Sequence, residues 1–282
     1  MTERLADVSQ RIGTTRQLGA VVNAMRGIAG ARAQQSRALL PAVRAFAEIA
    51  ARAIGQARLL EAPGTAAASR TQATGKPGLL VFGAEQGFAG AFVEQVLDAA
   101  EAGFGDAHVF LVGTRSAVLA AQRQLAVDWH GELPSRASAI PDTATLIVDA
   151  LYAYLGQAGA VPIAMVYPVW TVGRGVAVTR RALLPFDPKA FPVAAGTAGP
   201  LTNLPAADLI ARLGQEYVFA QVCEAALEAF AAENEARMAT MAAAKTNIDS
   251  KLTTLQALER RIRQEEVTAE VVELAAGARA RN

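Results

Sequence analysis

The sequence is poor in the residues that disulfide frameworks, metal centres and nucleic-acid surfaces require. Its 282 residues include one cysteine, Cys223, and two histidines, His108 and His130. A lone cysteine excludes an intrachain disulfide framework and fits a reducing compartment, and two separated histidines offer no metal cluster. Lys and Arg total 27 and Asp and Glu total 26, so no large net field attracts nucleic acid or an anionic membrane surface. We expect neither a metal nor nucleic acid as a ligand.

Aromatic residues are also scarce, at 6%, although 52% of the residues are hydrophobic. Much of the hydrophobic total is alanine, which favours long, closely packed helices over a thick globular interior. We expect no secretory leader, because Glu3, Arg4 and Asp7 interrupt the first ten residues. The longest uncharged stretch, residues 150–173, is broken by glycines and prolines. We interpret it as a helix end, a turn and a buried strand rather than a membrane span.

Proline is absent from both ends of the chain. None of the twelve prolines precedes Pro41 and none follows Pro205, which leaves residues 206–282 without that helix breaker. A helix over these 77 residues would span on the order of 100 Å, far more than a globular core needs. At the other end we expect a helix over residues 1–60, with Pro41 as a possible kink or break. Both ends are therefore predicted to be long helices.

Both expected helices carry an apolar stripe with steps of three and four residues. The C-terminal stripe comprises Ile248, Leu252, Leu255, Leu258 and Ile262. The N-terminal stripe comprises Leu5, Val8, Ile12, Thr15, Leu18, Val22, Met25 and Ile28. Such spacing is typical of a helix that faces a partner helix. Because a domain between them must receive one helix and send out the other, we predict an antiparallel coiled coil.

The middle of the chain has the pattern of an α/β domain. Short apolar runs predict strands at 78–83, 108–113, 162–170 and 175–184, and helical patterns fall at 92–102, 115–125 and 142–155. This order predicts a mostly parallel, doubly wound, Rossmann-like sheet over residues 77–184. A linker, 61–76, precedes the domain, and a proline-rich loop, 185–205, leads into the C-terminal helix, 206–282.

The sharpest candidate for chemistry is the glycine-rich segment 83–90, Gly-Ala-Glu-Gln-Gly-Phe-Ala-Gly, between the first strand and the next helix. Loops in this position cradle phosphates in dinucleotide-binding proteins. The first glycine of that fingerprint would fall at Glu85, whose carboxylate repels a pyrophosphate, and no acidic residue ends the second strand to bind a ribose. We interpret the segment as a tight turn and expect no cofactor. A nucleotide-binding Rossmann-type enzyme remains an alternative.

No nucleophile, base and acid are spaced in a pattern that indicates a catalytic triad. His108 is expected to begin a strand and His130 to lie in a loop, each in a structural role. Cys223 lies beside Val222 and Ala226 in the expected C-terminal helix, which favours a small buried apolar role over a reactive thiol. We therefore predict no catalytic residue.

Motifs at the two ends of the chain match one known family. Residues 233–247 read Glu-Asn-Glu-Ala-Arg-Met-Ala-Thr-Met-Ala-Ala-Ala-Lys-Thr-Asn. Further matches are Arg263-Gln264, Thr268, Glu270, Glu273, Gly277-Ala278, Ile12, Asn23-Ala-Met25 and Phe46-Ala-Glu48. Together these residues resemble the gamma subunit, or central stalk, of F-type ATP synthases. The resemblance covers essentially the whole chain and is most specific near the C-terminus.

One segment and one single position depart from the family pattern. The family commonly has Asp-Arg-Gly-Leu-Cys-Gly-Gly after the first strand, where this chain has Ala84-Glu-Gln-Gly-Phe-Ala-Gly90. A lysine that is usual before the N-terminal Ala-Met is Asn23 here. These departures indicate a divergent branch, such as the alternative bacterial ATPases that move protons or Na⁺.

The resemblance implies a rotating, non-catalytic shaft. The coiled coil would sit inside a ring of three α and three β subunits, and the α/β domain would stand on the c-ring beside the epsilon subunit. Membrane contact would be only through the c-ring, at the cytoplasmic face of the bacterial inner membrane. The family match implies partner-binding or coupling roles for Met25, Arg237, Arg263, Gln264, Thr268 and Glu270. A coiled-coil scaffold unrelated to rotary machines is a further alternative.

Overall fold

The chain divides into two compact units. A computed structural model describes residues 5–60, 74–187, 190–191 and 201–279. The first unit combines Met1–Ile28 with Met238–Asn282, and the second is Ala29–Arg237. Two long helices, α1 (Leu5–Ala57) and α5 (Ala206–Arg279), contribute residues to both units. The prediction of a long helix at each end is confirmed.

Helix α1 runs through Pro41 without interruption, and a single 3₁₀ turn, Arg58–Leu60, follows it. A proline removes one backbone hydrogen bond and disfavours the interior of a helix. Here the adjacent Leu40 is buried in the core of the second unit, so tertiary packing holds the helix together at that point. The possible break at Pro41 is not present.

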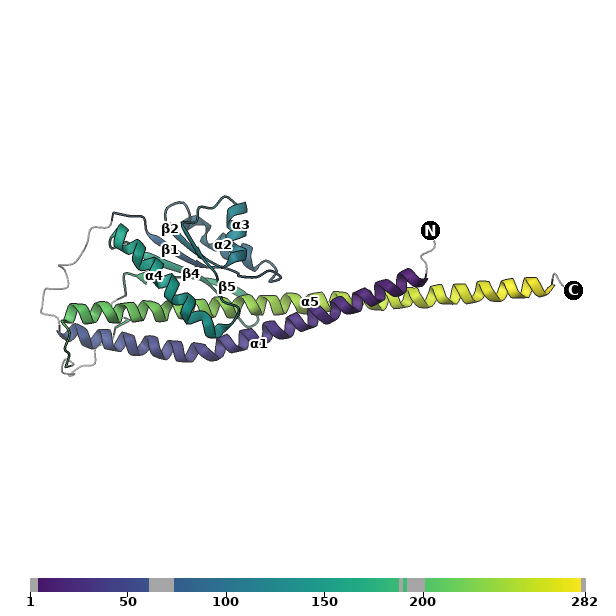
Figure 1. The fold of residues 1–282 in the computed structure, drawn as a ribbon, viewed down its shortest axis with the longest axis horizontal. Helices are drawn as coiled ribbons and strands as arrows, with labels where there is room; N and C mark the ends of the chain where they lie inside the picture. The colour runs from purple at the N-terminus through teal and green to yellow at the C-terminus, as the bar shows by residue number, and fades with distance from the viewer. Residues whose placement is uncertain (1–4, 61–73, 188–189, 192–200, 280–282) are drawn as a thin grey trace. The chain divides into compact units, whose positions relative to one another are not determined.

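In the first unit, α1 and α5 pack as an antiparallel pair (Figure 1). Val8 and Ile12 form a buried cluster with Leu255 and Ile262. Further along α1, Val22 forms a second cluster that includes Ile248. Residues later in α1 therefore contact residues earlier in α5, as the predicted antiparallel coiled coil requires.

The predicted N-terminal stripe is wrong at Leu18 and Ile28, which are 53% and 55% exposed. Gly19 rather than Leu18 faces α5 in the seam, because a Cβ built on Gly19 would lie 3.2 Å from the Ile248 Cγ2 atom. A helix advances about 100° per residue, so Leu18 lies about 120° short of two full turns from Ile12. Gly19, seven residues on from Ile12, returns to within about 20° of the same face. Two successive steps of three residues thus turn a side chain away from the seam.

The second unit contains a five-stranded sheet. Its strands are β1 (Gly78–Phe82), β2 (His108–Val112), β3 (Trp129–Gly131), β4 (Ile163–Thr171) and β5 (Gly175–Leu184). Its shorter helices are α2 (Phe92–Ala100), α3 (Thr114–Gln122) and α4 (Ile140–Ala158). Single 3₁₀ turns cover Glu101–Gly103 and Ala137–Ala139.

The strand order is β3-β2-β1-β4-β5. Strands β3, β2, β1 and β4 are parallel, and β5 pairs antiparallel with β4. The mostly parallel sheet is confirmed, and His108 begins β2 as expected. His130 does not lie in a loop as predicted, because it is the central residue of β3. A three-residue strand that ends in glycine is too short to show a strand pattern in the sequence.

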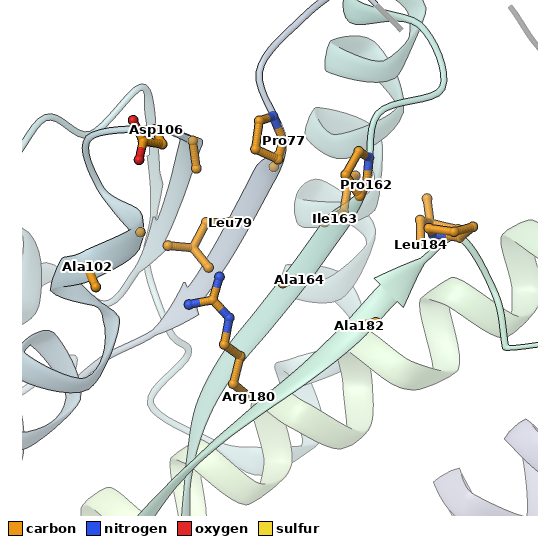
Figure 2. Close-up of a pocket in the computed structure, with 14 residues that line it drawn as sticks. Pro77, Leu79, Ala102, Asp106, Pro162, Ile163, Ala164, Arg180, Ala182 and Leu184 are labelled. Carbon is orange, nitrogen blue, oxygen red and sulfur yellow. The ribbon is translucent and has the colours of Figure 1, made fainter.

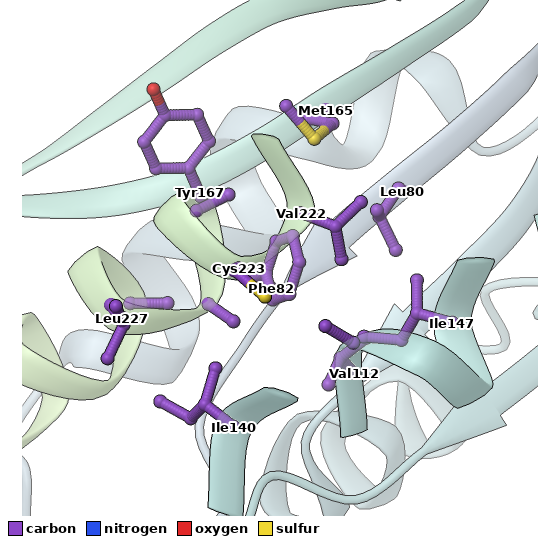
Figure 3. Close-up of a cluster of buried hydrophobic side chains, with 14 of the residues drawn as sticks. Leu80, Phe82, Val112, Ile140, Ile147, Met165, Tyr167, Val222, Cys223 and Leu227 are labelled. Carbon is purple, nitrogen blue, oxygen red and sulfur yellow. The ribbon is translucent and has the colours of Figure 1, made fainter. Parts of the chain in front are cut away.

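Apolar side chains cover both faces of the sheet. On one face, Leu80 and Phe82 of β1 pack with α4 and with residues 218–230 of α5 (Figure 3). On the other face, Leu79 and Val81 pack with α2. Successive side chains of a strand point to opposite faces, and a parallel sheet buried on both faces reads as a continuous apolar run. That is why the β1 segment could be predicted from the sequence.

Residues 150–173 comprise the end of α4, a turn and all of β4, as the sequence predicted. Among the described residues, no helix combines the length and the hydropathy needed to cross a bilayer.

Candidate functional site

The glycine-rich segment 83–90 lies at the carboxyl end of β1. The Gly83 N–H donates to the Val112 carbonyl oxygen over 2.7 Å. A Cβ on Gly83 would lie 2.2 Å from the Ser116 Oγ, so no larger residue fits. That hydroxyl accepts a hydrogen bond from the Ala84 N–H at 2.8 Å. Close contact with α3 therefore determines the glycine at this position.

A carboxylate of α5 binds the amides of this segment. The backbone N–H groups of Glu85 and Gln86 each donate to Glu233, at 3.0 Å to separate carboxylate oxygens. Glu233 is 2% exposed. Two adjacent amides that converge on one anion form the arrangement by which glycine-rich loops bind phosphate. In this chain the anion is its own glutamate side chain.

Arg237 completes the buried polar cluster. Its guanidinium pairs with Glu233 one helical turn earlier and donates to the Asn234 Oδ1 at 3.0 Å. It also donates to the carbonyl oxygens of Gly87, at 3.0 Å, and Gln86, at 3.2 Å. Buried charges are tolerated when they are paired and their remaining hydrogen-bonding groups are satisfied. Glu233, Asn234 and Arg237, which we call the α5 polar cluster, therefore fasten the segment to α5.

Glu85 fastens the other side of the same segment. Its carboxylate accepts hydrogen bonds from the Thr114 N–H at 3.0 Å, the Thr114 hydroxyl at 2.7 Å and the Leu133 N–H at 2.9 Å. Thr114 is the first residue of α3, where a helix favours negative charge. The residue that departs from the dinucleotide fingerprint is thus a structural ligand of the neighbouring helix.

The nucleotide-binding alternative loses its support from this geometry. In a doubly wound sheet, ligands bind at the carboxyl ends of the strands where the strand order reverses, which is between β1 and β4 here. The loop amides at that point already bind Glu233. The spacing of Glu233 and Arg237 by four residues is the signal that could have predicted an ion pair within the helix. Nothing local in the sequence indicated that the pair would bind residues near position 86.

Further polar contacts hold α1 against α5 within the second unit. Arg44 donates to Glu224 at 2.8 Å and to Glu228 at 2.7 Å, and the Ser36 hydroxyl donates to the Leu227 carbonyl at 2.7 Å. The bond to Glu224 raises the pKa of the Arg44 guanidinium. Burial raises the pKa of the Glu228 carboxyl, against the opposing effect of the arginine.

Cys223 is buried in the core between α5 and the sheet, beside Phe82 and Val222 (Figure 3). Burial raises the pKa of its thiol to about 12. A thiol in this environment is protonated and unreactive at neutral pH. The predicted role as a small apolar residue is confirmed.

The residues that the family match singled out lie in different environments. Arg237 is 5% exposed and belongs to the α5 polar cluster of the second unit. In the first unit, Met25 packs beside the Val22 cluster in the seam. The exposed residues of the first unit in this set are Arg263, Gln264, Thr268 and Glu270.

Two of these exposed residues make contacts within their own helix. Arg263 lies 3.7 Å from Glu259, and the Thr268 hydroxyl donates to the Gln264 carbonyl at 2.7 Å. Arg263 and Thr268 are both exposed. Within the described ranges, no three His, Cys, Asp or Glu side chains are close enough together to hold a metal ion.

The fold and the site together define a protein with a helical stalk and an α/β domain. In that domain, the backbone amides of segment 83–90 bind the chain's own Glu233. The chain is 25% identical to an ATP synthase gamma chain of Solibacter usitatus, with 98% of each chain covered. It is 22% identical to an ATP synthase gamma chain of Geotalea daltonii, with 97% of each covered. Its fold is similar to a chain of the Euglena gracilis mitochondrial ATP synthase, in a structure of OSCP, F1 and c-ring. The TM-score is 0.63 at 12% identity, over 98% of this chain and 94% of that one.

The family model of the ATP synthase family matches residues 4–280. The chain belongs to the ATP synthase family. Both curated relatives are gamma chains and match it along nearly its whole length, as the resemblance of the terminal motifs indicated. Gamma chains are non-catalytic subunits of ATP synthases.

Proposed function

We propose that this chain is the rotating central stalk of an ATP synthase and couples ion flow to conformational change in catalytic subunits. The observation that carries the proposal is an antiparallel helix pair whose exposed residues include Arg263 and Gln264, in a chain related to gamma chains. A shaft that is asymmetric about its axis presents a different face to each surrounding subunit as it turns. Each catalytic site then passes through states of different nucleotide affinity.

The partners proposed for this stalk are the α and β subunits of F1, the epsilon subunit and the c-ring. The similar Euglena chain comes from a structure that contains F1 and a c-ring, which supports this set. The stalk is peripheral, with membrane contact only through the c-ring, at the cytoplasmic face of a bacterial inner membrane. Residues 1–60 and 206–282 form the shaft, residues 77–184 the α/β domain, and 61–76 and 185–205 the connections.

Six residues carry the proposed coupling in two ways. Arg263 and Gln264 touch a β-subunit loop, since long polar side chains on a rigid helix can bond a partner in one rotational state and release it in the next. Thr268 and Glu270 extend the same exposed surface. Met25 and Arg237 support coupling from within, Met25 in the seam and Arg237 in the α5 polar cluster.

A matched pair of arginines tests the contact surface. Arg261 and Arg263 are similarly exposed, at 71% and 65% of their side chains, and each lies near a glutamate one turn away in α5. Arg263→Ala is expected to lower ATP-driven ion pumping by the assembled complex roughly fivefold or more, as the loss of about 1 kcal/mol at the contact implies. Arg261→Ala should leave pumping near the wild-type level. Equal losses for both variants would contradict the assigned contact.

Assembly is tested separately. Coexpression with the α and β subunits from the same genome should yield a complex with one copy of this chain per three of each. If the chain never associates with them, the proposed function fails. A chain that instead forms a homodimer through its own seam would support the scaffold alternative.

A further inference from the structure

A pocket of about 440 Å³ opens beside the sheet, at the amino-terminal ends of β1 and β4 (Figure 2). It lies at the opposite end of these strands from segment 83–90. Small residues create it: Gly78 begins β1, Gly103 ends the turn after α2, and Ala164 and Ala182 pair across β4 and β5. Helix α2 ends at Ala100, so it does not cover this part of the sheet.

Arg180 lies on the wall of this pocket. Side chains of a strand alternate between faces, which puts Arg180 on the same face of β5 as Val176 and Val178. Both valines pack against the apolar cluster that contains α2. Arg180 pairs with Val166 of β4, whose side chain is fully buried in that cluster. Unlike Val166, Arg180 is exposed, so it lies at the solvent side of that cluster.

The Arg180 guanidinium points across the pocket toward Leu79, as Figure 2 shows. A Cβ built on Gly103 would lie 3.7 Å from its Nη1 and 3.8 Å from its Nη2. The Arg180 side chain is exposed, and it is not among the described residues that form an ion pair or a side-chain hydrogen bond. Ala102, Ala164 and Ala182 line the same pocket and are at least partly exposed. A cation without a protein partner therefore stands at the wall of an apolar hollow.

We propose that this pocket binds an aliphatic monocarboxylate, with the carboxylate on Arg180 and the chain against Ala102, Ala164 and Ala182. A guanidinium can donate two parallel hydrogen bonds to one carboxylate. The volume falls within the range of small-molecule pockets, which are mostly apolar with a few oriented polar groups. A monoanion fits better than a phosphate because the pocket offers one cation and no helix N-terminus, and Asp106, which also lines it, repels a doubly negative ligand more strongly than a singly negative one.

The competing role for Arg180 is protection of the sheet edge. Strand β5 is the last strand of the sheet, and inward-pointing charges on edge strands prevent pairing with other chains. That role requires only the charge. The proposed role requires the charge and the hollow together, so the two can be separated by variants of each.

Isothermal titration of the full chain with octanoate tests the proposal. Saturable binding at one site is expected, and octanol, which lacks the charge, should bind more weakly. Arg180→Gln should weaken octanoate binding roughly tenfold or more, the usual effect of losing a charge-assisted hydrogen-bonded pair. Ala182→Leu, at an exposed position on the pocket wall, should abolish binding by filling the hollow while Arg180 remains.

Arg174→Gln is the matched control, because Arg174 is an exposed arginine in the turn between β4 and β5 and does not line the pocket. It should bind octanoate as the wild type does. The proposal is overturned if octanoate does not bind at millimolar concentration, or if Arg180→Gln binds it equally well. It is also overturned if Ala182→Leu retains binding, or if aggregation is the sole effect of Arg180→Gln, which would assign Arg180 to edge protection.

Discussion

Helix α5 belongs to two different environments along its length. Among residues 218–237, in the second unit, none is exposed, whereas residues 263–276, in the first unit, are all exposed. The buried part is rich in alanine and contains the α5 polar cluster. The exposed part contains four glutamates together with Arg263, Gln264 and Thr268. One continuous helix therefore serves as the core of a domain in one part and as a solvated surface in the other.

The difference shows how one secondary structure can separate stability from recognition. A helix that is buried all round must carry small side chains where other elements approach it closely, and its charges must be paired. Ala225, Ala226 and Ala229 meet the first condition, and Glu233 with Arg237 meets the second. An exposed helix is free of both conditions, so its side chains can be chosen by a partner. Substitutions in the two parts should accordingly differ in kind.

Removal of the Arg237 guanidinium should have the largest effect. Arg237→Ala leaves the Glu233 carboxylate buried without its cation, which costs about 3–5 kcal/mol. Urea unfolding followed by tryptophan fluorescence measures this, because Trp129 and Trp170 both lie in the second unit. Arg263→Ala should change the free energy of unfolding by less than about 0.5 kcal/mol. Unfolding of both variants at the same urea concentration would contradict the difference between the buried and the exposed part of α5.

The double variant Glu233→Leu/Arg237→Met serves as the control for that experiment. It removes both charges and replaces them with apolar groups, which is often nearly neutral for a buried pair. It should therefore recover much of the stability that Arg237→Ala loses. A double variant as unstable as the single one would show that the hydrogen bonds to Gln86 and Gly87, rather than the charge pairing, dominate.

Replacing an alanine with leucine should have a smaller effect on stability, and this effect should again differ between the buried and the exposed part of α5. Ala229 is fully buried, and Ala257 is exposed on the same helix. Ala229→Leu adds carbon atoms to a packed core and should cost about 1–3 kcal/mol. Ala257→Leu should change the stability by less than about 0.5 kcal/mol, since both residues are good helix formers. Circular dichroism during thermal unfolding measures both, and equal shifts in Tm would refute the assignment of the two environments.

Alkaline pH should weaken the second unit through Cys223. The pKa of the thiol is about 12 in the folded chain and about 8.5 when unfolded. Between these values the folded state holds a proton that the unfolded state releases, so stability falls as pH rises, by about 1.4 kcal/mol per pH unit. Urea unfolding at two pH values between 9 and 12 measures this slope. Cys223→Ala should show a shallower slope, and the remainder should come from tyrosines such as Tyr167, whose pKa burial also raises.

Features that depend on neighbours in the sequence could be predicted, and features that depend on distant contacts could not. The apolar runs of β1 and β2 and the stripe at Ile248 and Leu255 are local patterns, and they form the predicted elements. The bonds from Glu85 and Gln86 to Glu233 join residues about 150 positions apart, so no window of sequence contains them. The pocket is equally non-local, because its walls come from β1, β4, β5 and the turn after α2.

The smallest expected effects come from the glycines of α1 in the first unit. Gly13 has no atom within 4 Å of a built Cβ, whereas the Cβ of an alanine at 19 would lie 3.2 Å from the Ile248 Cγ2. Gly13→Ala should therefore realise the full gain in helix propensity, about 0.8–1 kcal/mol. Gly19→Ala should gain less, because the Ile248 side chain must move to admit the methyl group. Hydrogen exchange of the α1 amides in residues 5–28 measures the local gain. Equal protection in the two variants would show that the seam at Gly19 is looser than the packing against Ile248 indicates.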